Sequence, residues 1–353
     1  MNLKKVLLTS AQVAITIALL YFVFRDPTKR AQMATALQLA NYWWMALGIV
    51  AYLIVELAAA IRWQVLLRVQ GIRLSNSRVG ALFLIGMFYN QFMPGGTGGD
   101  IIKSYLLLKE TPDRKAGALL AVMFDRVIGL IALITITGVL ISLRYNWLAS
   151  IPETKRLLWL LMIVLGSSVL ALITSFIVSG FHLLHRLPHK FPGREKLIEV
   201  SAAYHLYAHH WRATLVAFGM SIIAHLATFS TFLCVAYALH AQDLRNTPPT
   251  NVPVVDFFAI MPIERTISSL PISFGGAGWR EIVLQILLHN LAGVREGVAN
   301  LIGSLSFLII LICSVPGGIV YFFYRPSGAQ GHVKMREMRE EVATLEHGFA
   351  EEK

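Results

Sequence analysis

Residues 94–100 read Pro94-Gly95-Gly96-Thr97-Gly98-Gly99-Asp100 and interrupt an otherwise hydrophobic segment. A second break, at residues 271–278, reads Pro271-Ile272-Ser273-Phe274-Gly275-Gly276-Ala277-Gly278. Asp100 ends the first break, and Arg280 follows the second within two positions. Non-helical backbone at membrane depth is tolerated only where protein or a water-filled cavity surrounds it. Two such breaks, one in each half of a membrane chain, indicate a transport site.

The composition is that of a membrane protein. Of 353 residues, 56% are hydrophobic and 14% are charged, whereas a soluble domain carries about 25% charged residues. The net charge of +11 is interpreted as topology signals and contacts to anionic lipid, and no nucleic acid is expected as a partner. Both cysteines, Cys234 and Cys313, lie in apolar segments, which argues against a disulfide framework or a metal site.

Six segments are long and apolar enough to cross a bilayer, since a membrane helix needs about 20 mainly apolar residues. They are 6–24, 43–62, 117–142, 157–179, 213–240 and 298–323. The first is interpreted as a retained helix rather than a signal peptide, because its apolar run is long and no small-residue cleavage site follows. We expect an all-α, polytopic membrane helix bundle. Residues 1–325 would form a single transmembrane domain, and residues 326–353 a cytoplasmic charged tail.

Two further pairs of segments are too short or too broken to span the membrane in the ordinary way. These pairs are 79–93 with 100–110, and 254–271 with 279–292. If both termini are cytoplasmic, Lys and Arg collect on the cytoplasmic side only when each pair returns to the side from which it entered. The charges therefore predict two re-entrant helical hairpins that enter from opposite sides, as in an inverted repeat. The alternative is that each limb crosses fully as a short helix.

Motifs for nucleotides and metals do not fit this chain. In the first break Asp100 follows Gly99, where a P-loop requires lysine. Segment 181–211 is rich in histidine, but no cysteine or carboxylate shares the face of its histidines, so no metal site is expected. We interpret this segment as a cytoplasmic, interfacial amphipathic helix. With no nucleophile or cofactor motif either, we expect no catalytic residues, no cofactor and no enzymatic activity.

The first glycine break nevertheless suits an anion. A helix that begins near Gly99 would present free N–H groups and the positive end of its dipole, and glycines let a bulky headgroup approach the backbone. Lys103 lies one turn further on and would add a positive charge. A purely structural interpretation stays open, in which the glycines form a tight turn and Asp100 caps the helix.

Charged residues inside apolar segments are expensive, at about 2.5–3.5 kcal/mol or more each at the bilayer centre. Three adjacent acid–base couples are among them, and their members point about 100° apart on a helix, so we expect each to pair with a different segment. The expected site for an anionic headgroup comprises the cations Lys103, Arg126, Arg265 and Arg280, the acids Asp100, Asp125, Glu264 and Glu281, and the glycines Gly95, Gly96, Gly98, Gly99, Gly275, Gly276 and Gly278. Glu56, deep in the second helix, is the candidate for proton coupling, and Arg62 is expected near the membrane interface. The alternative is that these charges form only structural ion pairs between helices.

Residues 90–100, Asn90-Gln91-Phe92-Met93-Pro94-Gly95-Gly96-Thr97-Gly98-Gly99-Asp100, together with Lys103, resemble the N-x-x-x-P-G-x-x-G-G-D-x-x-R/K signature of the lysylphosphatidylglycerol synthase transmembrane family. Asp125-Arg126 and the stretch from Pro271 to Glu281 are similar to its second and third blocks, and the likeness extends over residues 5–325. The resemblance implies lipid handling, because in bifunctional members this region flips an aminoacylated lipid that a cytoplasmic domain makes. The chain resembles a stand-alone, flippase-like member. Lys103 stands where arginine is common, and Trp279 where a smaller or β-branched residue is usual, so the headgroup stays open.

We therefore expect the protein to flip an anionic or phosphate-containing lipid across the bacterial inner membrane, with its N- and C-termini in the cytoplasm. A phospholipid, a hopanoid-related lipid or a polyprenyl-phosphate lipid would be the partner, and a homo-oligomer or a lipid-synthesis enzyme could join it. Two alternatives stay open. One is a membrane enzyme that acts on a lipid-linked phosphate, and the other is a non-transporting partner that docks a lipid-modifying enzyme through 181–211 or the tail.

Overall fold

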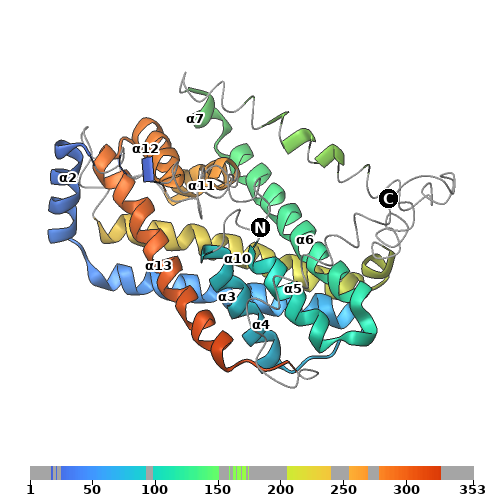
Figure 1. The fold of residues 1–353 in the computed structure, drawn as a ribbon. Helices are drawn as coiled ribbons and strands as arrows, with labels where there is room; N and C mark the ends of the chain where they lie inside the picture. The colour runs from blue at the N-terminus through green and yellow to red at the C-terminus, as the bar shows by residue number, and fades with distance from the viewer. Residues whose placement is uncertain are drawn as a thin grey trace.

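The computed structural model describes residues 25–92, 98–150, 205–239, 254–268 and 278–326, with scattered positions at 17, 18, 21 and between 159 and 174. The described residues form helices and their connections, with no β-strand among them (Figure 1). This confirms the predicted all-α membrane bundle. The predicted spans 6–24 and 157–179, most of 181–211 and the tail 330–353 lie largely or wholly outside the described residues.

Four helices of the described part are long and apolar enough to cross a membrane. They are α3 (Tyr42–Val69), α6 (Lys115–Leu143), α10 (Trp211–Ala238) and α13 (Glu296–Phe323). They correspond to the predicted segments 43–62, 117–142, 213–240 and 298–323. The agreement follows from hydropathy alone, because a run of about 20 apolar residues satisfies its backbone polar groups in lipid only as a helix.

Helices α3 and α10 lie side by side and run in opposite directions (Figure 1). At one end the backbone N–H of Asn41 donates to the carbonyl of Ala238 at 2.8 Å. Near the other end the hydroxyl of Tyr207 donates to the carbonyl of Leu66 at 3.2 Å. Small residues such as Gly48 lie at the contact, as expected where membrane helices approach closely.

Helices α4 (Asn76–Phe92) and α5 (Gly98–Glu110) form an antiparallel hairpin. At its closed end the N–H of Gly99 donates to the side-chain oxygen of Asn90 at 2.9 Å. At its open end Arg78 forms an ion pair with Glu110. Helix α3 ends, α6 begins and α13 ends on this same side of the bundle, which we call the Glu110 end.

The closed end of this hairpin depends on a glycine. A Cβ at Gly99 would overlap the carbonyl oxygen of Gly86 and the backbone of Asn90. Since any side chain would separate the two helices, Gly99 is required for their close approach. Gly99 therefore allows α4 to pack closely against α5, in addition to any role in the turn between them.

Helices α11 (Val254–Ser268) and α12 (Trp279–Ala292) form a second pair that is directed the other way. Their inner ends meet where the indole N–H of Trp279 donates to the carbonyl of Ile267 at 3.1 Å. Asp256, near the outer end of α11, pairs with Arg144 just after α6. Helix α12 leads through Gly293 into α13 on the same side of the bundle, which we call the Glu296 end.

A further helix, α2 (Pro27–Gln38), covers the Glu296 end. The side chain of Gln32 accepts the N–H of Gly297 at 2.9 Å, and Lys29 forms an ion pair with Glu296 at 2.8 Å. The sequence predicts no element here because the segment is polar and too short to span. Two short elements, η1 (Pro112–Arg114) and α7 (Tyr145–Ser150), complete the described connections.

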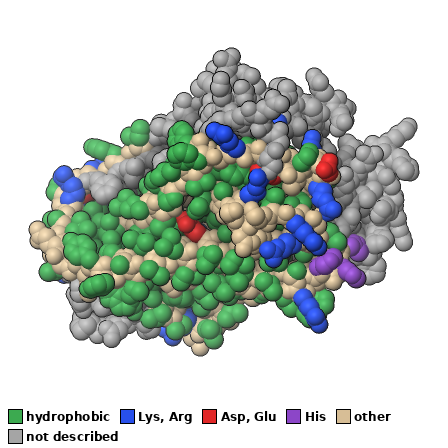
Figure 2. All heavy atoms as spheres, turned by 90° about the horizontal axis from the view of Figure 1, so that it is seen from below, with side chains coloured by type: hydrophobic (Ala, Val, Ile, Leu, Met, Phe, Trp, Pro, Cys, Tyr) green, Lys and Arg blue, Asp and Glu red, His purple; other side chains and the backbone are tan. Residues whose placement is uncertain are grey.

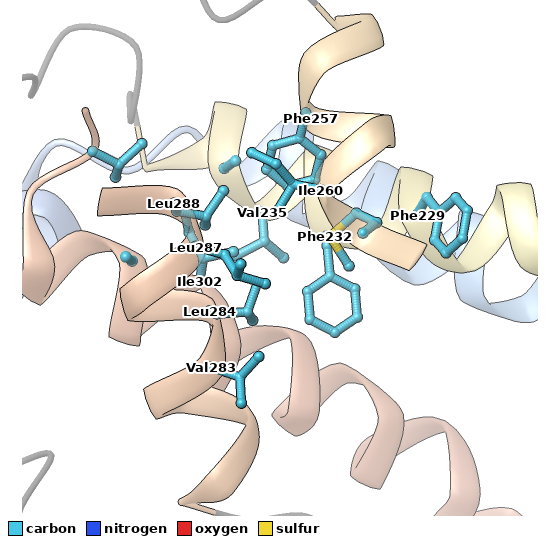
Figure 3. Close-up of a cluster of buried hydrophobic side chains, with 14 of the residues drawn as sticks. Phe229, Phe232, Val235, Phe257, Ile260, Val283, Leu284, Leu287, Leu288 and Ile302 are labelled. Atoms are coloured by element: carbon cyan, nitrogen blue, oxygen red, sulfur yellow. The ribbon is translucent and has the colours of Figure 1, made fainter. Parts of the chain in front are cut away.

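The main hydrophobic core holds the α11–α12 pair against α10 and α13 (Figure 3). Phe232 and Val235 of α10 face Ile260 of α11 and Leu284 of α12. A second cluster, centred on buried side chains such as Trp63, joins α3, α4, α5 and α6 toward the Glu110 end. Each hairpin is thus packed against long helices on its own side of the molecule.

The surface is divided in the way that a bilayer requires. Figure 2 shows a broad hydrophobic face, with Lys and Arg gathered toward one end next to the histidines. Among the described residues, the basic side chains at the Glu110 end are Arg68, Arg73, Arg78, Lys109, Arg114, Lys115, Arg212 and Arg325. Those at the Glu296 end are Arg25, Lys29, Arg30, Arg144 and Arg295.

The contact between α13 and the first hairpin supplies a stability prediction. A Cβ at Gly317 of α13 would overlap the carbonyl of Leu84 in α4, so Gly317→Ala should cost about 1–3 kcal/mol through overpacking. We expect a lower thermal unfolding temperature in detergent. Gly138→Ala is the control, because no atom lies within 4 Å of a Cβ there. Equal stability of the two variants would contradict the packing.

The hairpin geometry supplies a topology prediction. Arg73 precedes α4 and Asp113 follows α5, and both are exposed at the Glu110 end. In a chain whose native cysteines are replaced by alanine, a cysteine at either position should react with an impermeant thiol reagent from the same side of the membrane. A cysteine at Thr28, exposed at the Glu296 end, should react from the other side. Labelling of positions 73 and 113 from opposite sides would contradict a hairpin whose two ends lie on one side of the membrane.

Candidate functional site

A bidentate ion pair joins α3 to α6 inside the bundle. Nε of Arg62 lies 2.7 Å from Oδ1 of Asp125, and its Nη2 lies 3.1 Å from Oδ2. The third donor, Nη1, lies 3.2 Å from the hydroxyl of Ser221 on α10. Arg62 does not extend toward the surface as expected: its side chain is 13% exposed, and its planar fork matches a buried carboxylate on the neighbouring helix.

Lys103 of α5 is buried beside this pair. Its Nζ lies 3.8 Å from a carboxylate oxygen of Asp100 and 3.9 Å from one of Asp125. The same ammonium lies 4.5 Å from the ring centre of Trp63 and 5.8 Å from that of Phe83. Carboxylates and aromatic faces together replace the water that a buried ammonium loses.

Arg126 extends the network toward the surface, where it forms an ion pair with Asp100. Its side chain is 58% exposed, while that of Asp100 is 18% exposed. Neighbours Asp125 and Arg126 therefore pair with α3 and α5 respectively, as the 100° spacing of adjacent helical residues predicts. The Asp100 carboxylate therefore forms ion pairs with Lys103 and Arg126, so it does more than cap its helix.

These five residues form what we call the Arg62 cluster: Arg62, Asp100, Lys103, Asp125 and Arg126. Three of them are cations and two are carboxylates, so the fully ionised cluster carries a net charge of +1. It lies at the closed end of the α4–α5 hairpin. One unit of positive charge with an exposed guanidinium at its edge suits a monoanionic phosphate group.

The glycine break contributes less anion-binding backbone than the sequence suggests. Gly98 and Gly99 are buried at the start of α5, but the N–H of Gly99 already donates to Asn90. This N–H is therefore not free to bind an anion. Gly95 and Gly96 lie outside the described residues, as do Gly275 and Gly276 of the second break.

A second group of charges, which we call the Glu264 cluster, lies where α11 meets α12. Its members, which interact electrostatically with one another, are Glu264, Arg265, Arg280 and Glu281. The guanidinium of Arg280 is buried and lies 4.4 Å from the ring centre of Phe307. Glu281 accepts the N–H of Gly278 at 2.7 Å and so caps α12. Tyr52 of α3 interacts electrostatically with Glu56, Arg265 and Arg280.

Two buried carboxylates are incompletely hydrogen-bonded. Glu264 is fully buried, and the hydroxyl of Ser268 approaches its carboxylate without completing a hydrogen bond of normal geometry among the described residues. Oε1 of Glu56, buried in α3, lacks a partner within the same part of the chain. Buried polar groups are normally hydrogen-bonded, so each exception calls for an explanation.

His225 of α10 lies between the two clusters. Its Nε2 lies 3.0 Å from the carbonyl oxygen of Gly129 on α6, and the ring interacts electrostatically with both Arg62 and Arg265. Sequence reasoning missed His225 and Ser221 because each is a lone polar residue in an apolar segment. Their spacing of four residues, which places both on one face of α10, is the signal that could have identified them.

A polar contact fixes the outer end of the first hairpin. The hydroxyl of Tyr324 donates to Glu110 at 2.7 Å. Burial raises the pKa of this hydroxyl, and the neighbouring Glu110 carboxylate raises it further. Tyr324 therefore stays protonated and keeps donating, which ties the end of α13 to the end of α5.

Histidine and carboxylate groups do not assemble into a metal site in the described part of the chain, where no three His, Cys, Asp or Glu residues meet in a suitable group. His182, His185 and His189 lie outside the described residues.

Comparison with protein families finds a match over most of the chain. The model of the lysylphosphatidylglycerol synthase TM region matches residues 9–318, a range that includes both hairpins and both ion clusters. A comparison with curated proteins finds no match.

The Arg62–Asp125 pair supplies a stability prediction. Asp125→Asn removes the carboxylate that compensates Arg62 and Lys103, and breaking a buried pair in this way should cost roughly 3–5 kcal/mol. Arg62→Gln combined with Asp125→Asn should cost less than the sum of the two single changes, because no buried charge of the pair is then left alone. Thermal unfolding in detergent measures both. Asp113→Asn, at an exposed site, is the control, and strict additivity would contradict a direct interaction.

Proposed function

The chain belongs to the lysylphosphatidylglycerol synthase transmembrane-region family, and from this premise we propose that it flips a lipid with an anionic, phosphate-containing headgroup. Its family and its long apolar helices make it a multi-pass membrane protein of lipid metabolism or transport. The specific step of flipping is our proposal. It is supported by charge buried at the closed ends of two oppositely directed hairpins.

The observation that carries the proposal is the positive balance of the Arg62 cluster. A phosphate in the hydrocarbon core would lose its hydration, and a charge there is expensive unless it is paired. The surplus cation of this cluster would compensate that phosphate. Arg126 is the most exposed member and would make first contact, while the tails remain in lipid beside the hydrophobic face.

The two oppositely directed hairpins could each give the lipid access to the site from one side of the membrane. In transporters with inverted repeats, the substrate lies near the midplane and alternates between access from each side. We infer that the α4–α5 pair and the α11–α12 pair are re-entrant and serve opposite leaflets. His225 lies between their clusters, which provides a polar side chain on the path from one to the other.

Orientation follows from the basic residues. Because Lys and Arg are concentrated at the Glu110 end, we place this end in the cytoplasm by the positive-inside rule. The membrane would then be the bacterial inner membrane, with both termini cytoplasmic. We propose transport rather than catalysis, with a phospholipid, a polyprenyl-phosphate lipid or a hopanoid-related lipid as the cargo.

A reconstituted assay tests the proposal. Protein in liposomes should move fluorescent phosphatidylglycerol or a labelled polyprenyl phosphate between leaflets, as measured by reduction of the outer dye. Arg126→Ala and Arg265→Ala should lower the rate at least about tenfold, a loss of about 1.4 kcal/mol of stabilisation of the moving headgroup. Arg73→Ala, which removes an exposed arginine outside both clusters, is the matched control.

Two results would contradict this function. Folded wild-type protein that moves none of the phosphate-bearing lipids would exclude flipping. Wild-type rates in both arginine variants would show that these arginines only hold helices together.

A further inference from the structure

The two clusters differ in charge in a way that matters for an anionic cargo. The Arg62 cluster has a net charge of +1, as described above. The Glu264 cluster contains two cations, Arg265 and Arg280, and two carboxylates, those of Glu264 and Glu281. Fully ionised, it carries no net charge. Residues 269–277, which join α11 to α12, contain no charged side chain that would alter this balance.

An anionic headgroup would therefore be attracted by the first cluster but not by the second. A cargo that leaves the positive cluster would enter a neutral one within the low-dielectric interior, where charge interactions are strong. A proton on Glu264 would give the Glu264 cluster the same charge of +1 as the Arg62 cluster.

The structure indicates which carboxylate takes the proton first. Glu281 is compensated by the N–H of Gly278, whereas Glu264 is fully buried without a hydrogen bond of normal geometry from the described residues. The hydroxyl of Ser268, one turn further along α11, approaches the Glu264 carboxylate but does not complete such a bond. A buried carboxylate without hydrogen bonds gains more from becoming neutral than a capped one does.

The charged groups that face Glu264 make this protonation depend on the cargo. They are Arg265 from its own helix, and Arg280 and Glu281 from α12. Before a headgroup binds, both arginines compensate the charge of the Glu264 carboxylate. An anionic headgroup that binds Arg265 and Arg280 competes for the same positive charge, and the carboxylate then takes a proton. By linkage, a proton on Glu264 strengthens headgroup binding to the same degree.

We propose that the Glu264 cluster binds the phosphate-bearing headgroup together with a proton, and that the Glu264 carboxylate receives this proton. The inference rests on the proposed function and extends it to the energy source. The lipid crosses with a compensating proton, so a proton gradient across the membrane drives it in one direction. Glu56, whose Oε1 is also without a partner in the described residues, provides a second position for a proton near Tyr52.

Binding alone tests the inference, without any need for transport. Dihexanoyl phosphatidylglycerol is added to wild-type protein in nanodiscs of neutral lipid, in weak buffer that contains a pH-indicator dye. Wild-type protein should take up protons as the lipid binds, and its affinity should rise as the pH falls. Glu264→Gln should bind with little proton uptake and with an affinity that is nearly independent of pH. Asp113→Asn should behave like the wild type.

A spectroscopic measurement identifies the protonated group and controls for folding. The infrared difference spectrum on lipid binding should show a new C=O band of a protonated carboxyl in the wild type, and this band should be missing in Glu264→Gln. Unfolding temperatures of the two proteins confirm that both are folded. Absence of proton uptake in the wild type, or an unchanged uptake in Glu264→Gln, would overturn the inference.

Transport measurements separate the two proposals. Flipping that is equally fast with and without a pH gradient would preserve the proposed function and overturn the proton coupling. Proton uptake on binding, with no flipping of any lipid, would overturn the proposed function and preserve the coupled binding site. If both proposals hold, a pH gradient changes the wild-type rate several-fold, and Glu264→Gln loses this sensitivity.

Discussion

The fork that Arg62 forms with Asp125 and Ser221 ties α3, α6 and α10 together where each would otherwise expose a polar group to an apolar interior. A single charge on any of these helices would be expensive in lipid, and the three become compatible only when packed. Lys103 and Asp100 extend the network to the first hairpin, and Arg126 extends it toward the surface. The hairpin therefore occupies its place because its charges are compensated there.

The two clusters show two ways of keeping charge inside a membrane protein. The first is saturated with ion pairs and aromatic contacts, and its net charge stays positive. The second keeps a carboxylate in the interior without a hydrogen bond of normal geometry from the described residues, although a hydroxyl lies one turn away. A fully paired network favours a rigid arrangement, whereas an incompletely paired one gains a partner when a ligand or a proton arrives. The difference suits one site that holds a headgroup steadily and another that changes its charge.

Much of this architecture is predictable from the sequence, because hydropathy and glycine breaks act locally. The segments 43–62 and 298–323 are identified by their apolar length, and the limbs of both hairpins by charges next to glycines. The ion-pair and hydrogen-bond partners of a residue, by contrast, depend on segments that are distant in the sequence. Arg62 is ion-paired in the interior because α6 brings Asp125 to it, and the N–H of Gly99 is occupied because Asn90 folds back onto it. Helix α2 is likewise defined by its docking on α13 rather than by its own hydropathy.

Helix α13 contacts α12 near the Glu296 end and α4 near the Glu110 end, and Tyr324 ties its last turn to Glu110. One continuous helix thus touches both hairpins at its two extremities (Figure 1). A displacement of either hairpin must be transmitted along this shared rod or absorbed at Pro316, the proline within it. Under the proposed function, this shared rod would make the movements of the two hairpins depend on each other, and with them the access from the two leaflets.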